Sequence, residues 1–277
     1  MTEASVSSDS PAPGSPLSGL RVLVPRAGAE DPIARAVREA GAVPVTVALT
    51  ETVPAHDTVM ERALALGGAA WLVLTSARTV SVLADYAART GTPLGERLRR
   101  AVAAGTRLAV VGPATAAALA GIGHPPHLCA TAPESARTLL AGFPRPGGGG
   151  RVILPCSALA APELVRGLRE RGWDVDRQDV YTTRGADLDA AARARLTEPW
   201  PDVILLTAGS TVRALVALLG PPPSSTAIAV IGDPTRRAAE QAGLRVGGVA
   251  PEATPAGLIA AAAQSLRHCH PDPGADH

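Results

Sequence analysis

The chain contains several short runs of apolar residues that no polar residue interrupts. Each run precedes a stretch with the composition of a helix, and the runs lie at residues 72–74, 108–111, 152–154, 203–206 and 228–231. A strand with one face in water alternates apolar and polar residues, so strands without this alternation are buried on both faces. Together with the helices between them, these strands predict an α/β fold with doubly wound parallel sheets.

The first predicted helix shows how local signals agree with this pattern. A strand at residues 22–24 is followed by a helix at about residues 32–40, with Asp31 in the N-cap position, Pro32 in the first turn and Gly41 just beyond the end. Each of these residue types is favoured at its position. A second extended run follows at residues 43–50.

The two halves of the chain repeat one another in three successive pieces. A first strand motif at residues 21–25 returns at 151–155, a second at 72–76 returns at 204–208, and a third at 110–115 returns at 230–235. The spacing before the third piece is shorter in the second copy, which indicates a trimmed connection. Matches in the same order are unlikely by chance, and they predict two domains of one fold.

Two positions compete as the domain boundary. The Pro- and Gly-rich run at residues 144–150 has the composition of a linker, and a cut there gives two tandem domains. Alternatively, the extended segments at 43–51 and 175–183 pair as a connecting ribbon, which joins the first unit of the chain to its last part. The residues alone leave both possibilities open. The composition of residues 1–17 predicts a disordered tail.

The composition excludes several classes of protein. All 26 basic residues are arginines scattered along the 277-residue chain, and the formal net charge is +1, so nothing indicates nucleic-acid binding. Because no apolar run reaches the roughly 18 residues of a membrane span and the N-terminus has no leader pattern, we expect a cytoplasmic protein without a membrane partner. Cys129, Cys156 and Cys269 lack the spacing of a disulfide framework or a zinc site, and we interpret His268-Cys269-His270 as tail sequence.

Hydroxyl residues, glycine and arginine follow the predicted strands. In an open parallel sheet, ligands bind beyond the carboxyl ends of the strands, where loops lead into helix N-termini. Backbone N–H and hydroxyl groups at such places can bind anions. The residues concerned include Arg26, Thr75, Ser76, Arg78, Thr115, Cys156, Ser157, Ser210 and Thr235. The sequence therefore predicts a site for carboxylates or phosphates.

A purely structural interpretation of the hydroxyl residues competes with this one. A hydroxyl residue before a helix is most often an N-cap, and Thr75, Ser76, Thr115, Ser210 and Thr235 all suit that role. None of the glycine-containing turns is a Walker loop, and no G-x-G-x-x-G follows the first strand, so nucleotide binding is not indicated. No set of nucleophile, base and orienting residue can be named. We expect neither a metal nor an organic cofactor.

Tyr181 is one of only two tyrosines, and it lies in the extended segment at residues 175–183. One interpretation is that it packs on a sheet edge with its hydroxyl in water. The other is that it takes part in the chemistry of the protein.

The order and spacing of the motifs resemble those of the uroporphyrinogen-III synthase family, over about residues 20–263. The motifs are Leu74-Thr75-Ser76-Ala77-Arg78-Thr79-Val80, Val111-Gly112-Pro113-Ala114-Thr115-Ala116, Tyr181-Thr182-Thr183 after Gly172, Leu206-Thr207 to Val212, Ile231-Gly232 to Thr235, and Glu252-Ala253-Thr254-Pro255-Ala256-Gly257-Leu258. The resemblance implies a cofactor-free lyase that closes linear hydroxymethylbilane, with inversion of its last pyrrole ring, to uroporphyrinogen III.

The resemblance also implies two α/β domains joined by a two-stranded ribbon, with the active site in the cleft between them. This favours a discontinuous first domain of residues 18–44 and 184–264, a second domain of residues 52–174, and a ribbon of residues 45–51 and 175–183. Residues 265–277 are then a second disordered tail. We expect a monomer whose partner is its small-molecule substrate.

By resemblance, Tyr181 matches the tyrosine that assists departure of the substrate hydroxyl. Thr75, Ser76, Arg78, Thr115, Ser210 and Thr235 match positions that line the cleft, and Arg26 joins them from its place after the first strand. The chain departs from the family pattern at Cys156-Ser157, at Ala208 and at Asp233-Pro234. One alternative is a catalytically inactive member that binds a tetrapyrrole or related polycarboxylate. Another is a two-domain binding protein of the periplasmic kind, which the missing leader pattern opposes.

Overall fold

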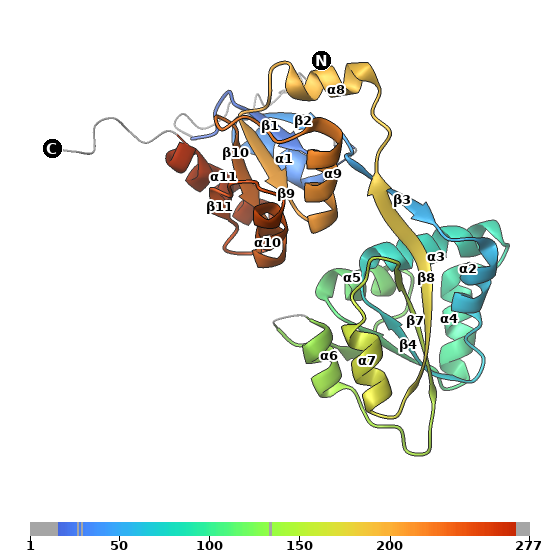
Figure 1. The fold of residues 1–277 in the computed structure, drawn as a ribbon. Coiled ribbons are helices and arrows are strands. Elements are labelled where there is room, and N and C mark those ends of the chain that lie inside the picture. The colour runs from blue at the N-terminus through green and yellow to red at the C-terminus, as the bar shows by residue number, and fades with distance from the viewer. Residues whose placement is uncertain (1–15, 27, 29, 133–134, 270–277) are drawn as a thin grey trace, which may run out of the picture. The chain divides into compact units, whose positions relative to one another are not determined.

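A computed structural model describes residues 16–26, 28, 30–132 and 135–269 of the chain (Figure 1). The chain divides into two compact units. The first unit consists of Met1–Glu51 and Arg184–His277, and the second consists of Thr52–Thr183. The first unit thus takes its residues from two separate parts of the chain, whereas the second is one continuous segment.

A five-stranded parallel sheet lies at the centre of the first unit. Its strand order is β11-β10-β9-β1-β2, which corresponds to the 2-1-3-4-5 order common in doubly wound sheets. The strands are β1 (Arg21–Val24), β2 (Val43–Thr46), β9 (Val203–Leu206), β10 (Ala227–Val230) and β11 (Gly248–Val249).

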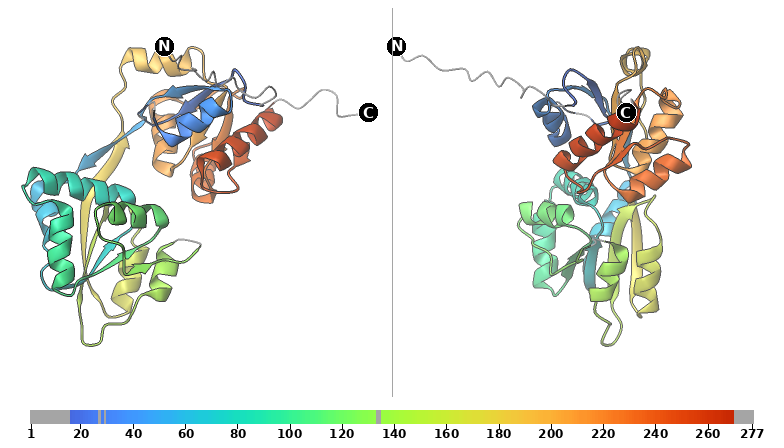
Figure 2. Two further views of the ribbon diagram at one scale, coloured as in Figure 1. Left: turned by 180° about the vertical axis from the view of Figure 1, so that it is seen from behind. Right: turned by 90° about the vertical axis from the view of Figure 1, so that its left-hand side faces the viewer.

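Helices cover both faces of this sheet, with α1 and α11 on one side and α9 and α10 on the other (Figure 2, right). Val22 and Val24 pack on the α1 side while Leu23, between them, packs on the α9 side, and all three are fully buried. The unbroken apolar runs of the sequence are explained by this double burial. The helices are α1 (Pro32–Glu39), α8 (Ala190–Thr197), α9 (Gly209–Leu219), α10 (Asp233–Gln241) and α11 (Pro255–Cys269).

The signals that predicted the first helix act as expected. The Oδ1 atom of Asp31 accepts a hydrogen bond from the backbone N–H of Ile33 at 2.9 Å. Gly41 has a φ of 76°, in the left-handed region that glycine adopts without strain. The helix therefore begins and ends within a residue of the predicted bounds.

The second unit is built on a six-stranded sheet with the order β3-β8-β7-β4-β5-β6. Leu72 and Leu74 pack on the face covered by α2, α3, α4 and α5, and Trp71 and Val73 pack on the face covered by α6 and α7. The strands are β3 (Thr50–Pro54), β4 (Ala69–Leu74), β5 (Arg107–Val110), β6 (Leu128–Cys129), β7 (Arg151–Ser157) and β8 (Asp174–Gly185). The helices are α2 (Asp57–Leu64), α3 (Ala77–Arg89), α4 (Leu94–Ala103), α5 (Pro113–Gly121), α6 (Ala136–Gly142) and α7 (Glu163–Glu170).

The predicted internal repeat is visible in the strand order. Strands β1, β2, β9, β10 and β11 of the first unit correspond to β7, β8, β4, β5 and β6 of the second, and each set lies in the same spatial sequence. The trimmed connection of the second copy is the one from α9 to β10, which has no counterpart of α4. The prediction of two doubly wound units related by a repeat is confirmed.

Strands β3 and β8 form the two-stranded ribbon, in which each strand passes from one unit into the other. The backbone N–H of Ala55 donates to Val180 O, and that of Ala186 donates to Leu49 O, both at 2.9 Å, so the two strands run antiparallel. The Gly-rich run at residues 144–150 lies inside the second unit and does not separate the units.

The ribbon differs in extent from the one expected at residues 45–51 and 175–183. Val45 and Thr46 belong to β2, which pairs with β1 in the first sheet. The first part of β8, from Asp174 to Tyr181, pairs with β7 in the second sheet. The sequence did not distinguish these segments because a strand inside a sheet and a strand in a ribbon have the same extended pattern.

The expected tails are shorter than predicted where the structure describes them. Leu17 is fully buried in the core between the sheet and α1 and α11. At the other end, α11 continues to Cys269, and Ser265 is fully buried. Residues 1–15 and 270–277 lie outside the described residues. The prediction was wrong for Leu17 and for 265–269 because one buried side chain at a segment end has little weight in a compositional average.

Candidate functional site

In each unit the chain leaves two neighbouring strands in opposite directions. In the second unit it passes from β4 toward β5 and from β7 toward β8, and in the first unit from β9 toward β10 and from β1 toward β2. Ligands of doubly wound sheets bind beyond the carboxyl ends of strands at such a reversal. Thr75 and Ser76 follow β4, Arg26 follows β1, and Ser210 follows β9, so these predicted residues lie where the fold favours a ligand.

The second unit brings Tyr181 and Ser76 together. Their hydroxyl oxygens lie 3.2 Å apart although the residues are separated by 105 positions in the chain. The side chain of Tyr181 belongs to the core on the α3 face of the sheet, and only 7% of the residue is exposed. Strand β8 lies between β3 and β7, so Tyr181 is not on a sheet edge, and its ring packs in the core with the hydroxyl beside Ser76.

A β-bulge in β8 sets the direction of Tyr181. Cys156 pairs with Asp179 and the next residue, Ser157, pairs with Tyr181, so Val180 is the extra residue of the bulge. In a regular strand Val180 and Tyr181 would point to opposite faces of the sheet, but both pack in the core on the α3 face. The bulge therefore turns the phenol toward Ser76 at the start of α3.

Ser76 is held by the first turn of the helix that it caps. Its Oγ atom accepts a hydrogen bond from the backbone N–H of Thr79 at 3.1 Å and lies 2.9 Å from Thr79 Oγ1. Thr79 is fully buried. The sequence motif contained Thr79, but nothing in the sequence showed that its hydroxyl would contact the same serine as the tyrosine.

The capping interpretation holds for Ser76 and fails for the other hydroxyl residues. Helices α5, α9 and α10 begin after Gly112, Ala208 and Gly232 and have no side-chain hydrogen bond at the N-cap. Thr115 and Thr235 lie in the first turns of α5 and α10 and are each 3% exposed, while Ser210 is the second residue of α9 and is half-buried. The N-termini of α5, α9 and α10, at the carboxyl edges of the sheets, are thus left without a side-chain acceptor.

The two predicted arginines differ in their surroundings. Arg78 is exposed in the first turn of α3, beside Ser76. The Nε atom of Arg26 lies 3.3 Å from Asp31 Oδ2, so part of its charge is already offset by the carboxylate that caps α1. Of the two, Arg78 is the side chain better placed to bind a further anion.

Cys156 occupies the position in the second unit that Arg26 occupies in the first. Its Sγ atom lies 3.6 Å from Asp179 Oδ1, and the same carboxylate oxygen accepts a hydrogen bond from Arg177 Nε at 2.7 Å. Burial raises the pKa of the Cys156 thiol to about 12, and Asp179 adds to the effect while Arg177 opposes it. Cys156 is therefore a protonated, unreactive thiol at neutral pH.

The carboxylate of Asp233, which departs from the family pattern, has a local partner. Arg236 Nε donates to Asp233 Oδ1 at 3.0 Å, and Arg236 Nη1 donates to Glu240 Oε1 at 2.9 Å. These two carboxylates raise the pKa of Arg236, with the hydrogen bond to Asp233 as the largest cause. The negative charge of Asp233 at the start of α10 is thereby partly neutralised.

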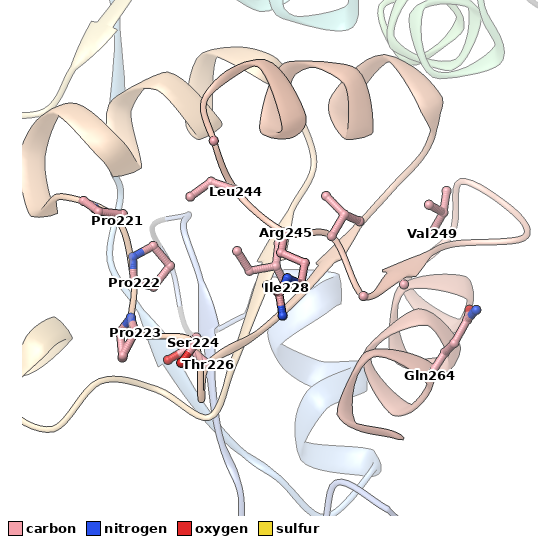
Figure 3. A pocket seen from close by; sticks show the side chains of 14 residues that line it. Pro221, Pro222, Pro223, Ser224, Thr226, Ile228, Leu244, Arg245, Val249 and Gln264 are labelled. Carbon is pink, nitrogen blue, oxygen red and sulfur yellow. The ribbon is translucent and has the colours of Figure 1, made fainter. Parts of the chain in front are cut away.

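Two cavities lie elsewhere, at the amino ends of strands of the first sheet. A cavity of about 560 Å³ is lined by the segment before β10, the segment between α10 and β11, and Gln264 of α11 (Figure 3). Ile228, Leu244 and Arg245 line it together (Figure 3). A cavity of about 650 Å³ lies at the amino ends of β1 and β9, near Trp200. Neither contains any of the predicted site residues.

Within residues 16–26, 28, 30–132 and 135–269, no group of three or more His, Cys, Asp or Glu side chains is arranged to hold a metal ion. In the same residues, no helix combines the length and the hydropathy needed to cross a membrane.

Comparison with known proteins agrees with the motifs found in the sequence. The family model "Uroporphyrinogen-III synthase HemD" matches residues 31–260. The chain is also 27% identical, over 238 residues, to the porphyrin biosynthesis protein HemD of Ruminiclostridium josui. That alignment covers 83% of this chain and 45% of the relative, so the chain spans about half the length of that protein.

Solved structures share the fold at low sequence identity. A mutant uroporphyrinogen III synthase of Thermus thermophilus is similar with a TM-score of 0.59 and 20% identity, over 91% of this chain and 98% of that one. Uroporphyrinogen-III synthetase of Helicobacter pylori is similar with a TM-score of 0.57 and 16% identity, over 87% and 97%. Because the family model covers most of the chain, from the first helix into the last, this protein belongs to the uroporphyrinogen-III synthase family.

Proposed function

We propose that the protein is a uroporphyrinogen-III synthase, which converts linear hydroxymethylbilane into uroporphyrinogen III with loss of one water molecule. Membership of the family supports this proposal. The observation in the structure that carries it is the phenol of Tyr181, held 3.2 Å from Ser76 Oγ beyond the carboxyl end of β4, where a doubly wound sheet binds its ligand.

The reaction requires a proton and a fixed geometry more than it requires a strong acid or base. The C–O bond of the terminal hydroxymethyl group breaks, and the departing oxygen takes a proton to leave as water. The substituted carbon of the last ring then attacks the resulting azafulvene to form a spiro-pyrrolenine, which fragments and recombines. Loss of a ring proton completes the macrocycle, so the proton that was consumed is returned.

Tyr181 is assigned the delivery of that proton, or of a hydrogen bond, to the departing hydroxyl. A neutral phenol can donate while its ring stays packed in the core, and a positioned donor of this kind accelerates a reaction by about 10²-fold or more. The ring is held by the core on the α3 face and the oxygen is held by Ser76. These contacts restrict the phenol to one orientation.

The carboxylate arms of the substrate are assigned to the helix N-termini and to arginine. Every ring of hydroxymethylbilane carries an acetate and a propionate, and each unit offers helices that begin without a side-chain cap. Backbone N–H groups at a helix N-terminus favour an anion. Thr75, Thr115, Ser210 and Thr235 add hydroxyl groups nearby, and Arg78 adds an exposed positive charge.

The test is the identity of the product isomer. Hydroxymethylbilane generated immediately before use is incubated with the protein, the product is oxidised to porphyrin, and the type I and type III isomers are separated by chromatography. The control is the same incubation without protein, in which the free azafulvene closes to the type I isomer. We expect type III to dominate in the presence of the protein.

Type I alone in both incubations would contradict the proposed function. If the protein then still bound uroporphyrinogen in a titration, the result would favour the alternative of an inactive family member that binds a tetrapyrrole polycarboxylate. The departure at Ala208, where the second unit has Ser76, would then be the first position to restore to a hydroxyl residue.

A further inference from the structure

We propose that Thr79 acts through Ser76 to fix the direction of the hydrogen bond at Tyr181, so that the phenol accepts from Ser76 and keeps its own proton for the substrate. Thr79 and Ser76 are thus positioning residues in a chain of three hydroxyl groups. The inference rests on the proposed function, because it specifies how the phenol of Tyr181 is prepared to donate.

The hydroxyl group of Ser76 can make only a limited number of hydrogen bonds. A serine hydroxyl has one proton and two lone pairs. The backbone N–H of Thr79 donates to Ser76 Oγ at 3.1 Å and takes one lone pair. Two hydroxyl neighbours remain, Thr79 Oγ1 at 2.9 Å and Tyr181 Oη at 3.2 Å. With one proton and one lone pair left, Ser76 donates to one of them and accepts from the other.

Burial of Thr79 decides between the two directions. Thr79 is fully buried, and among the described residues Ser76 is the partner that the structure gives to its hydroxyl. If Ser76 donated to Thr79, the proton of the Thr79 hydroxyl would be buried without an acceptor, which is unfavourable. If Thr79 donates to Ser76, the hydroxyl protons of Thr79 and Ser76 both have acceptors. Ser76 then donates to Tyr181.

This direction leaves the proton of Tyr181 free. A phenol that accepts a hydrogen bond is polarised toward donating its own proton, because linked hydrogen bonds strengthen one another. The opposite direction would use the phenol proton on Ser76 and make it unavailable to a departing hydroxyl. The buried threonine therefore determines which way the donor of the proposed reaction faces.

The first unit shows that the fold does not require this chain of hydroxyl groups. At the equivalent helix start, Ala208 stands in the place of Ser76, and α9 begins without a side-chain cap. Thr211 stands in the place of Thr79 and is buried as well, at 6% exposure. A buried threonine at this helical position is thus common to both units, but only the second unit adds Ser76 and Tyr181 to it.

The experiment compares Thr79→Val, Thr79→Ser and the matched control Thr211→Val. Valine keeps the shape of threonine and removes its hydroxyl, whereas serine keeps the hydroxyl. All three are made in the wild-type chain for kinetics and in a Tyr86→Phe chain for spectroscopy. Because the protein has two tyrosines, the latter leaves Tyr181 as the only phenol. The intensity ratio of the tyrosine doublet in the Raman spectrum distinguishes an accepting from a donating phenol.

We expect Thr79→Val to lower kcat for type III formation by about tenfold, the equivalent of one neutral hydrogen bond, with KM changed less than about twofold. The Raman doublet of Tyr181 should move from the accepting toward the donating ratio. Thr79→Ser should restore both, and Thr211→Val should change neither. A loss of activity through misfolding would also appear in the Thr211→Val control or in the melting temperature.

Two results would overturn the inference. An unchanged doublet and an unchanged kcat in folded Thr79→Val would refute the role of Thr79 and leave the proposed function intact. A parent protein in which Tyr181 already shows the donating ratio would refute the assigned direction. If the parent protein formed no type III isomer, the proposed function would be refuted. The positioning role of Thr79 in this reaction would then be refuted too, whatever the Raman doublet showed.

Discussion

Replacing Tyr181 by phenylalanine tests the proposed chemistry most directly. The substitution removes one oxygen and leaves the ring, which packs in the core on the α3 face. Only 7% of the residue is exposed. What is lost from the folded state is the contact with Ser76 Oγ at 3.2 Å. A neutral hydrogen bond contributes about 0.5–1.5 kcal/mol to stability, so the melting temperature should fall by only a few degrees.

The effect on the reaction should be much larger than the effect on stability. A positioned proton donor contributes about 10²-fold or more to a rate, which corresponds to about 2.7 kcal/mol of the activation free energy. We therefore expect Tyr181→Phe to slow type III formation by at least this factor. Binding of the product, which has no departing hydroxyl, should change little.

Tyr86→Phe is the matched control for this prediction. Tyr86 is the other tyrosine of the chain, is 3% exposed, belongs to the same core, and donates from its hydroxyl to Glu61 Oε1 at 3.0 Å. Its loss should cost similar stability and leave the rate unchanged. The assay is the initial rate of type III formation from fresh hydroxymethylbilane, with the melting temperature measured on the same samples. Full type III activity in Tyr181→Phe would refute the catalytic role of the phenol.

Three further predictions concern other parts of the site. The pKa of Cys156 is raised to about 12, and Cys129 is exposed, so iodoacetamide at pH 8 should alkylate Cys129 and spare Cys156 until the pH approaches 12. Peptide mass spectrometry measures the labelling of each cysteine. Rapid labelling of Cys156 in the folded protein would contradict this prediction. Dialysis against a chelator should leave the proposed activity unchanged, and activity lost and then regained with one metal would show otherwise. Single changes of Thr75, Thr115 or Thr235 to alanine should raise KM by about two- to tenfold and spare kcat, because several groups share each carboxylate. A fall in kcat at unchanged KM would instead place that threonine in the chemistry.

The sequence predicted the fold well because local signals and the repeat both pointed to it. The run from Val22 to Val24 is apolar without interruption, and the structure buries its residues on alternate faces of one sheet. Asp31 and Gly41 delimit α1 as their types suggest. The extent of the ribbon was less well predicted, because a strand in a sheet and a strand in a ribbon have the same extended pattern in the sequence.

The candidate site could be predicted as a set of residues but not as an arrangement. Ser76 and Tyr181 came from separate motifs, and their contact depends on the bulge at Val180, which the sequence does not mark with a glycine or proline. The role of Ser76 as a cap was correctly foreseen, whereas Thr115 and Thr235 were equally good candidates for caps and are not caps. Capping depends on where the helix begins relative to the hydroxyl residue, and such boundaries are weakly specified by sequence.

The discontinuity of the first unit bears on how the chain folds as it is synthesised. Strand β1 pairs with β2 on one side and with β9 on the other, and the ribosome makes β9 only after the whole of the second unit. The continuous segment Thr52–Thr183 has all of its own sheet partners and can fold as it emerges. Before β9 is synthesised, one edge of β1 is unpaired, and this edge lies in a segment of high apolar content. The nascent chain must therefore keep that edge from pairing with other strands.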